Sequence, residues 1–194
     1  MGVFVRMMED LAAADADPKT VMIDATYLKA HRTASTALLP TFRSRAIVGS
    51  EKGDLGRLIG RTRGGMNTKL HAVTDANGRP LSFFMTAGQV SDYTGAAALL
   101  DDLPKAQWLL GDRGYDADWF RDALQAKGIQ PWIPGRRSRL DPIKYDKRRY
   151  RRRSRIEIMF GRLKDWRRVA TRYDRCPTVF LSAIALAATV SLWL

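Results

Sequence analysis

Three acidic residues stand in settings that a phosphoryl-transfer site would need. Asp24 and Asp112 each follow a short apolar run, and Glu157 lies in an arginine-rich segment. Carboxylate oxygens are suitable ligands for Mg²⁺, which keeps several waters and needs only a few protein ligands. Two such ions about 3.5–4 Å apart can activate a nucleophile and stabilise the leaving oxygen of a phosphodiester. The three acids therefore predict a metal-dependent DNA-cutting site.

The segment around Glu157 has helical spacing. At about 100° per residue, four polar residues fall within an arc of about 60°. These residues are Tyr150, Arg153, Glu157 and Lys164. A neighbouring apolar stripe is suited to packing on a sheet. It consists of Ile156, Met159, Phe160 and Leu163. The spacing predicts a helix that holds Glu157 over the strands that carry the two aspartates.

Each acid also has a structural interpretation. An aspartate at the end of a strand commonly forms a turn or caps a helix, and a glutamate between arginines commonly forms a surface ion pair. Two other aspartates fit such roles, since Asp75 begins an Asp-Ala-Asn-Gly turn and Asp92 stands in the first turn of an expected helix. The occurrence of three acids in suitable settings within one basic chain favours the catalytic interpretation.

Positive charge is concentrated near the third acid. Of the net charge of +13, a net of +12 lies between Arg136 and Arg175, where 17 Lys and Arg stand against 5 acids. Aromatic residues and helical spacing distinguish this run from a solvated tail, and its charge favours an anionic partner such as DNA. The stretch Gly60–Lys69 adds arginines between glycines that would let a phosphate approach closely. The predicted DNA contacts are Arg61, Arg63, Lys69, Tyr150, Arg153, Arg162, Lys164, Arg167 and Arg168.

Alternating strands and helices must position these residues. The expected strands cover residues 20–23, 69–74, 81–86, 108–111 and 130–133, and Asp24 and Asp112 stand at the ends of two of them. An Asn-Gly pair between the second and third strands indicates a hairpin. The expected helices cover residues 91–103, 116–127 and 146–166, with irregular structure over 33–63. This order predicts an α/β fold of the ribonuclease H-like type, a mixed sheet flanked by helices.

Composition and the two ends of the chain bound the remaining possibilities. A length of 194 residues with 45% apolar content suits one domain over residues 20–194, after an N-terminal remnant or extension over residues 1–19. The apolar residues 179–194 fall short of the roughly 20 that cross a bilayer, so a buried C-terminal helix is expected and a membrane partner is not. A single cysteine and no secretory signal favour the cytoplasm.

Four stretches of the chain form a recognisable set: Ile23–Thr26, Gly60–His71, Gly111–Asp116 and Tyr150–Asp174. In the last stretch, tyrosine, arginine, glutamate and a basic residue are separated by two, three and six positions, as Tyr150, Arg153, Glu157 and Lys164. Together the stretches resemble the catalytic domain of bacterial insertion-sequence transposases of the DDE class, insertion-sequence-five type. The resemblance extends over about residues 20–194.

The resemblance implies that Asp24, Asp112 and Glu157 hold two Mg²⁺ ions, for which Mn²⁺ can substitute. It implies hydrolysis at the ends of a mobile element and attack of the freed 3′-hydroxyl on target DNA, with no covalent protein–DNA intermediate. A homo-oligomer on paired ends, associated with the nucleoid, is implied as well. Family members commonly carry a helical region before the first acid, so we expect a downstream reading-frame product that works with an upstream-frame protein.

Three other functions fit parts of the sequence. A catalytically incompetent DNA-binding remnant, or an inhibitor of a full-length transposase, would bind DNA without cutting it. A stand-alone ribonuclease H-like nuclease would cut DNA without joining ends. A membrane-associated basic protein would use residues 179–194 together with its arginines on anionic lipid. Cleavage, strand transfer and lipid binding distinguish these functions from transposition.

Overall fold

The computed structural model describes residues 2–14, 19–35 and 57–194, and a mixed sheet lies at its centre. The main strand order is β2-β3-β1-β5-β6, with β4 also paired to β3 and β7 also paired to β1. The strands are β1 (Thr20–Ala30), β2 (Gly60–Thr62), β3 (Gly65–Thr74), β4 (Pro80–Ala87), β5 (Trp108–Leu110), β6 (Gln130–Trp132) and β7 (Thr171–Arg172). The α/β class and the mixed sheet flanked by helices, expected from the sequence, are confirmed.

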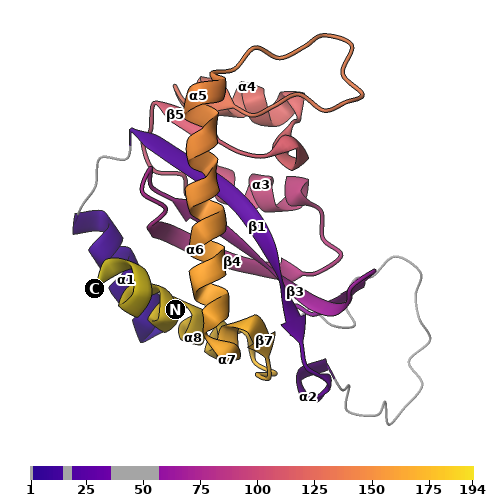
Figure 1. Cartoon of the computed structure of the whole chain (residues 1–194), viewed down its shortest axis with the longest axis vertical. Helices are drawn as coiled ribbons and strands as arrows, with labels where there is room; N and C mark the ends of the chain where they lie inside the picture. Colours follow the sequence, from indigo (N-terminus) through magenta and orange to yellow (C-terminus); the bar gives the residue numbers. More distant parts are fainter. Residues whose placement is uncertain (1, 15–18, 36–56) are drawn as a thin grey trace.

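Helices cover both faces of the sheet. They are α1 (Val3–Ala14), α2 (Arg32–Ser35), α3 (Asp92–Leu100), η2 (Arg113–Tyr115), α4 (Asp118–Ala126), α5 (Lys147–Tyr150), η3 (Arg151–Arg153), α6 (Ser154–Asp165), α7 (Arg167–Ala170), α8 (Pro177–Ala188) and η4 (Thr189–Trp193). Figure 1 shows α6 crossing in front of β1, with α1 and α8 beside its lower part. Helices α3 and α4 pack on the other face, where they share a core with Val21 and Ile23 of β1.

Strand β1 organises both cores because alternate side chains point to opposite faces of the sheet. Val21 and Ile23 are fully buried against α3 and α4. Met22 and Leu28 are buried on the α6 side, together with the expected apolar stripe of α6. The same alternation places Asp24, two residues after Met22, on the α6 side. The strand therefore carries the first acid beneath the arginine-rich helix.

Several expected elements are confirmed and some bounds are corrected. Strands β3 and β4 form the expected antiparallel hairpin, with Gly78 at φ 84° in its turn. The strand expected over 20–23 extends to Ala30, because β3 pairs with it as far as Lys29. The helix expected over 116–127 begins only at Asp118, since the preceding residues form the 3₁₀ turn η2. Strand β6 forms despite Pro131.

Two further segments differ from expectation. The helix expected over 91–103 ends at Leu100, with Ser91 as its N-cap. The interval 33–63, expected to be irregular, contains α2 and β2 within its described part, while residues 36–56 lie outside the described residues. Strand β2 forms because Gly60–Thr62 pairs with the start of β3 in antiparallel register.

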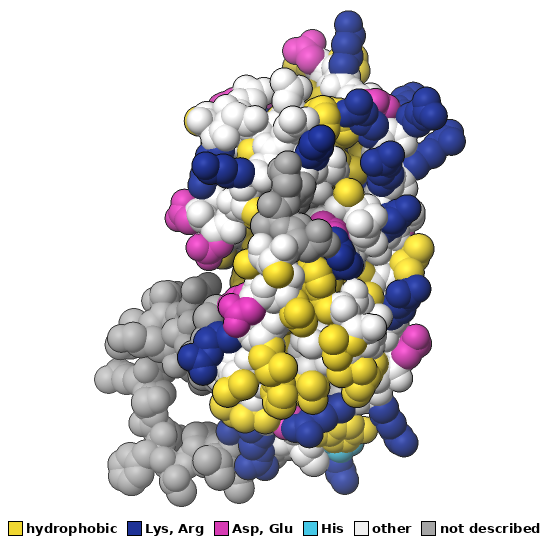
Figure 2. All heavy atoms as spheres, turned by 90° about the vertical axis from the view of Figure 1, so that its left-hand side faces the viewer, with side chains coloured by type: hydrophobic (Ala, Val, Ile, Leu, Met, Phe, Trp, Pro, Cys, Tyr) yellow, Lys and Arg dark blue, Asp and Glu magenta, His cyan; other side chains and the backbone are white. Residues whose placement is uncertain are grey.

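The two ends of the described chain pack together. Helix α1 contributes the fully buried Met8 to the core that also holds Phe180 and Ile184 of α8, so residues before position 20 contribute to this core. Pro177 is the first residue of α8. Hydrophobic side chains on the outer faces of α1, α8 and η4 form an apolar area on the face seen in Figure 2; they include Val3, Phe4, Met7, Val179 and Val190. In the described part of the chain, no helix has both the length and the apolar character needed to cross a bilayer.

Candidate active site

Asp24 lies within β1, and Asp112 lies just beyond the end of the neighbouring parallel strand β5. The register pairs Thr20 with Trp108 and Met22 with Leu110, so each aspartate stands two residues beyond the last paired position. Asp112 caps η2, and its Oδ1 accepts a hydrogen bond from the Gly114 amide at 2.7 Å. Asp24 was expected at a strand end but is the fifth residue of β1. The position of Asp24 is therefore fixed by the pairing of β1 with β3, which extends from Met22 to Lys29.

The hydrogen bonds that the Asp24 carboxylate accepts do not fully offset the cost of burying its charge. Its side chain is 15% exposed, its Oδ1 accepts from the Ala25 amide at 2.8 Å, and its Oδ2 accepts from Arg153 at 2.7 Å. Burial raises the pKa of Asp24 from 3.8 to about 6, and Asp112 adds to the rise, while Arg153 and the Ala25 amide oppose it. A buried carboxylate of raised pKa gains strongly from a nearby cation.

Arg153 links the first and third acids. Its guanidinium donates through Nη1 to Asp24 and through Nη2 to Glu157 Oε1. Further along the same helical face, Lys164 donates to Thr26 Oγ1 of β1 at 2.7 Å. Burial raises the pKa of Tyr150, and the charge of Asp112 contributes to the rise. The helical face that carries these four residues therefore lies over β1 and Asp24.

The donor set has the chemistry of a magnesium site, because all three candidate ligands offer carboxylate oxygens. Among the described residues, no three His, Cys, Asp or Glu side chains converge closely enough to hold a metal ion. Arg153 lies between Asp24 and Glu157 instead, and the Glu157 side chain is 54% exposed. The three acids suit a divalent ion because they offer carboxylate oxygens and because the raised pKa of Asp24 shows that its charge lacks compensation. Binding of an ion between Asp24 and Glu157 requires Arg153 to move from its present position.

The predicted DNA contacts divide into exposed and buried groups. Arg61 and Arg63 are exposed on the β2–β3 hairpin. Arg162, Lys164, Arg167 and Arg168 are exposed along α6 and α7, and Figure 2 shows basic side chains gathered at the right-hand edge. Lys69 is only 4% exposed, because its ammonium is held inside by the Val90 carbonyl and Asp92. Burial removes Lys69 from the surface that a DNA backbone could reach.

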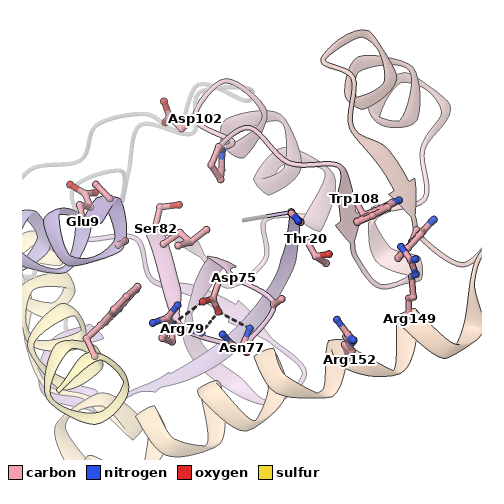
Figure 3. A pocket seen from close by; sticks show the side chains of 18 residues that line it. Glu9, Thr20, Asp75, Asn77, Arg79, Ser82, Asp102, Trp108, Arg149 and Arg152 are labelled. Atoms are coloured by element: carbon pink, nitrogen blue, oxygen red, sulfur yellow. Dashed lines mark hydrogen bonds and ion pairs between the residues drawn. The ribbon is translucent and has the colours of Figure 1, made fainter. Parts of the chain in front are cut away.

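A separate cavity of about 760 Å³ contains none of the three acids. Arg149 and Arg152 line it from the same helical segment that carries Tyr150 and Arg153, and Figure 3 shows Arg149 beside Trp108, with Arg152 further away. Arg149 lies over the stacked rings of Trp108 and Trp132, with centroid distances of 4.5 and 5.0 Å. At the hairpin turn, Asp75 accepts from Arg79, which confirms its expected turn role. The cavity is therefore distinct from the site formed by Asp24, Asp112 and Glu157.

Replacing Asp24 with asparagine should stabilise the metal-free protein at neutral pH. Below about pH 3.8 the carboxyl is protonated in both the folded and the unfolded chain, so it costs nothing. As the pH rises from about 3.8 to about 6, the Asp24 carboxyl ionises in the unfolded chain before it ionises in the folded chain, so the free energy of unfolding falls. Above about pH 6 the carboxyl is ionised in both states, and this loss of stability stays constant. We expect Asp24→Asn to raise the free energy of unfolding by about 1–3 kcal/mol at pH 7.5 and by much less at pH 4. Urea denaturation in EDTA measures this, and a pH-independent difference would contradict it.

The sequence did not identify two residues beside the acids. Tyr115 is 1% exposed and lies directly after the Asp112 turn, and Asp92 approaches the same turn from α3. Asp92 does occupy the first turn of its helix, as expected. Only the long-range packing of α3 against η2 brings it close to Asp112, so no local signal in the sequence could have revealed this proximity.

The fold and the paired aspartates define the class of protein. Helices on both faces of a mixed sheet, with one acid in a strand and another just beyond its parallel neighbour, constitute a ribonuclease H-like arrangement. The piggyBac transposase, solved as a synaptic complex with hairpin DNA, shares this fold with a TM-score of 0.53 at 9% identity, over 90% of this chain and 46% of that one.

The chain belongs to the transposase DDE domain family, which matches residues 15–192. It is 36% identical over 132 residues to the putative transposase for insertion sequence element IS6501 of Brucella ovis, covering 66% of this chain and 99% of that protein. It is 38% identical over 133 residues to the putative transposase for IS402 of Burkholderia cepacia, covering 59% of this chain and 60% of that protein. The match thus spans nearly all of one relative and less than two thirds of the other.

Proposed function

We propose that this chain is the catalytic domain of an insertion-sequence transposase of the insertion-sequence-five type. The observation that carries the proposal is the placement of Asp24 in β1 and of Asp112 just beyond the neighbouring parallel strand β5, beneath a basic helix that bears Glu157. The reaction is hydrolysis of phosphodiesters at element ends, followed by attack of the freed 3′-hydroxyl on a phosphodiester of target DNA, which joins the element end to one target strand and releases the 3′-oxygen of the other fragment. Residues 20–194 form the catalytic domain in this proposal, and residues 1–19 are an N-terminal extension, whose helix α1 packs against α8.

Asp24, Asp112 and Glu157 would hold two Mg²⁺ ions, or Mn²⁺ in their place. When bound, the ions supply an activated nucleophile and stabilise charge on the leaving oxygen. The protein's own groups would orient the site: β1 carries Asp24, the Gly114 amide donates to Asp112, and α6 carries Glu157, which Arg153 links to Asp24. Arg153 neutralises Asp24 and Glu157 until a metal ion arrives.

DNA would lie along the exposed basic side chains of the β2–β3 hairpin, α6 and α7. Arg162 and Lys164 are both exposed on α6 downstream of the third acid but point to different sides of the helix, with Lys164 towards β1. A homo-oligomer on paired ends is part of the proposal, supported by the synaptic complex reported for the piggyBac transposase. An upstream-frame partner and association with the nucleoid belong to the same proposal.

Removing single exposed arginines should reduce the salt dependence of DNA binding. Each phosphate contact that is lost lowers the slope of log affinity against log salt by about 0.9. We expect Arg162→Gln and Arg167→Gln each to lower it by about 1, across unrelated DNA sequences. The control is Lys127→Gln, which removes an exposed charge at the end of α4 on the opposite face of the sheet. Fluorescence anisotropy between 50 and 300 mM KCl measures the slopes, and equal slopes in all three variants would refute this DNA path.

Nicking of supercoiled plasmid tests the proposed function. The protein should nick plasmid in Mg²⁺ or Mn²⁺ and not in EDTA, and nicked ends should join to a second plasmid if the chain is a transposase. Cutting without joining would favour a stand-alone nuclease. Binding without cutting would favour an incompetent remnant or an inhibitor.

A further inference from the structure

Asp92 brings a fourth carboxylate to the edge of the acidic site. A Cβ atom placed on Gly114 would lie 2.8 Å from Asp112 Oδ1 and 3.0 Å from Asp92 Oδ2, so both oxygens border the same small space. The other oxygen of Asp92 is held by Lys69, whose Nζ lies 3.0 Å away and also donates to the Val90 carbonyl at 2.7 Å. Lys69 therefore holds Oδ1 of Asp92, while Oδ2 borders the same space as Asp112 Oδ1.

Tyr115 ends the turn η2, which Asp112 caps, and its buried hydroxyl has no hydrogen-bond partner among the described residues. The tyrosine is 1% exposed and packs against Phe120. Burial raises its pKa, and the charges of Asp92, Asp24 and Asp112 raise it further, so the hydroxyl is within electrostatic reach of all three carboxylates. A buried hydrogen-bond donor that lacks a partner costs about 1–3 kcal/mol of folding stability. Its position among three acids suggests that a ligand completes its bonding.

We propose that Asp92 and Tyr115 are positioning residues of the metal site, which receive the water shell and the carboxylates of a bound divalent ion. The inference rests on the proposed function. A Mg²⁺ ion keeps several of its waters, and such waters donate hydrogen bonds to carboxylates that do not touch the metal. With an ion held by the acids, Asp92 Oδ2 would accept one of these bonds, and the Tyr115 hydroxyl would donate to one of the carboxylates that hold the ion.

Groups that hold the ligands of a metal ion typically contribute 10–100-fold to its affinity. Tyr115→Phe removes only the hydroxyl, and Asp92→Asn removes the charge while retaining an oxygen. We expect each to weaken Mn²⁺ binding by about 10-fold or more, as measured by electron paramagnetic resonance of free Mn²⁺ in titrations of the whole chain with bound DNA duplex. In nicking assays the midpoint Mn²⁺ concentration should rise by a similar factor, and the rate should recover at high Mn²⁺.

Matched controls separate this role from structural damage. Tyr173→Phe removes a hydroxyl from a tyrosine that is 44% exposed and stacks on His31, and Asp102→Asn removes a charge from an exposed turn after α3. Both should leave Mn²⁺ affinity unchanged. If Asp112→Asn abolishes Mn²⁺ binding while Tyr115→Phe and Asp92→Asn bind normally, the inference fails and the proposed metal site survives. If the unaltered chain binds no Mn²⁺, both the inference and the proposed metal site fail. A loss of rate that high Mn²⁺ does not rescue would also overturn the inference.

Discussion

We expect replacing Asp112 with asparagine to lower the rate of metal-dependent DNA cleavage by about 10³-fold or more, on the scale of losing a central transition-state interaction. The amide is nearly the same size as the carboxylate and its oxygen can still accept from the Gly114 amide. What it loses is the negative charge that a divalent ion requires. DNA affinity should remain within about twofold, because the exposed arginines that carry binding are untouched. Single-turnover nicking of plasmid and anisotropy with a DNA duplex measure the two quantities.

Asp118→Asn is the matched control for that experiment. Asp118 lies six residues further along the chain, its side chain is 77% exposed, and it pairs only with Arg139 among the described contacts. We expect its cleavage rate to stay close to that of the unaltered chain. If Asp112→Asn retains more than a tenth of the rate, Asp112 holds no catalytic metal.

Replacing Arg172 with alanine should be the most destabilising change outside the apolar core. Arg172 is fully buried, and its guanidinium donates to Thr68 Oγ1 at 2.6 Å and to the carbonyls of Asp174 and Arg175. It also lies over the ring of Phe180, 5.1 Å from the centroid. Its removal leaves a cavity and unsatisfied acceptors between β3, β7 and α8. We expect a loss of about 3–5 kcal/mol, measured from the urea midpoint.

Arg168→Ala provides the comparison for Arg172. Arg168 is 61% exposed in its side chain and pairs with Asp174 at the surface. Exposed pairs of this kind contribute about 0–1 kcal/mol. Equal losses for the two variants would show that burial of Arg172 carries no special weight. A large loss for Arg172→Ala alone would show that it joins the C-terminal helix to the sheet.

The sequence predicted the order of the main elements because their signals are local. Alternating apolar runs marked the strands, the Asn-Gly pair marked the β3–β4 turn, and helical spacing placed Glu157 on the same face as Arg153. The bond from Arg153 to Asp24 is consistent with that spacing. Helix bounds were less accurate at the starts and ends, as with α4, where a 3₁₀ turn precedes the helix.

Long-range packing explains what the sequence could not predict. Lys69 reads as a surface cation, yet β3 is buried on both faces at that point and Asp92 neutralises it inside. Strand β1 appeared to end at Asp24 because the apolar run ends there, but pairing with β3 carries it five residues further, to Lys29. The approach of Asp92 to Asp112 depends on how α3 packs against η2. None of these contacts leaves a pattern in a single sequence.

Anomalous diffraction from crystals of the DNA-bound chain soaked in Mn²⁺ tests the central claim most directly, because it locates the metal. The account predicts a manganese peak in contact with carboxylate oxygens of Asp24 and Asp112, with Glu157 turned towards it and Arg153 displaced from between the acids. Manganese bound elsewhere, with Arg153 still joining Asp24 to Glu157, would contradict the assignment of these three acids as the catalytic metal site.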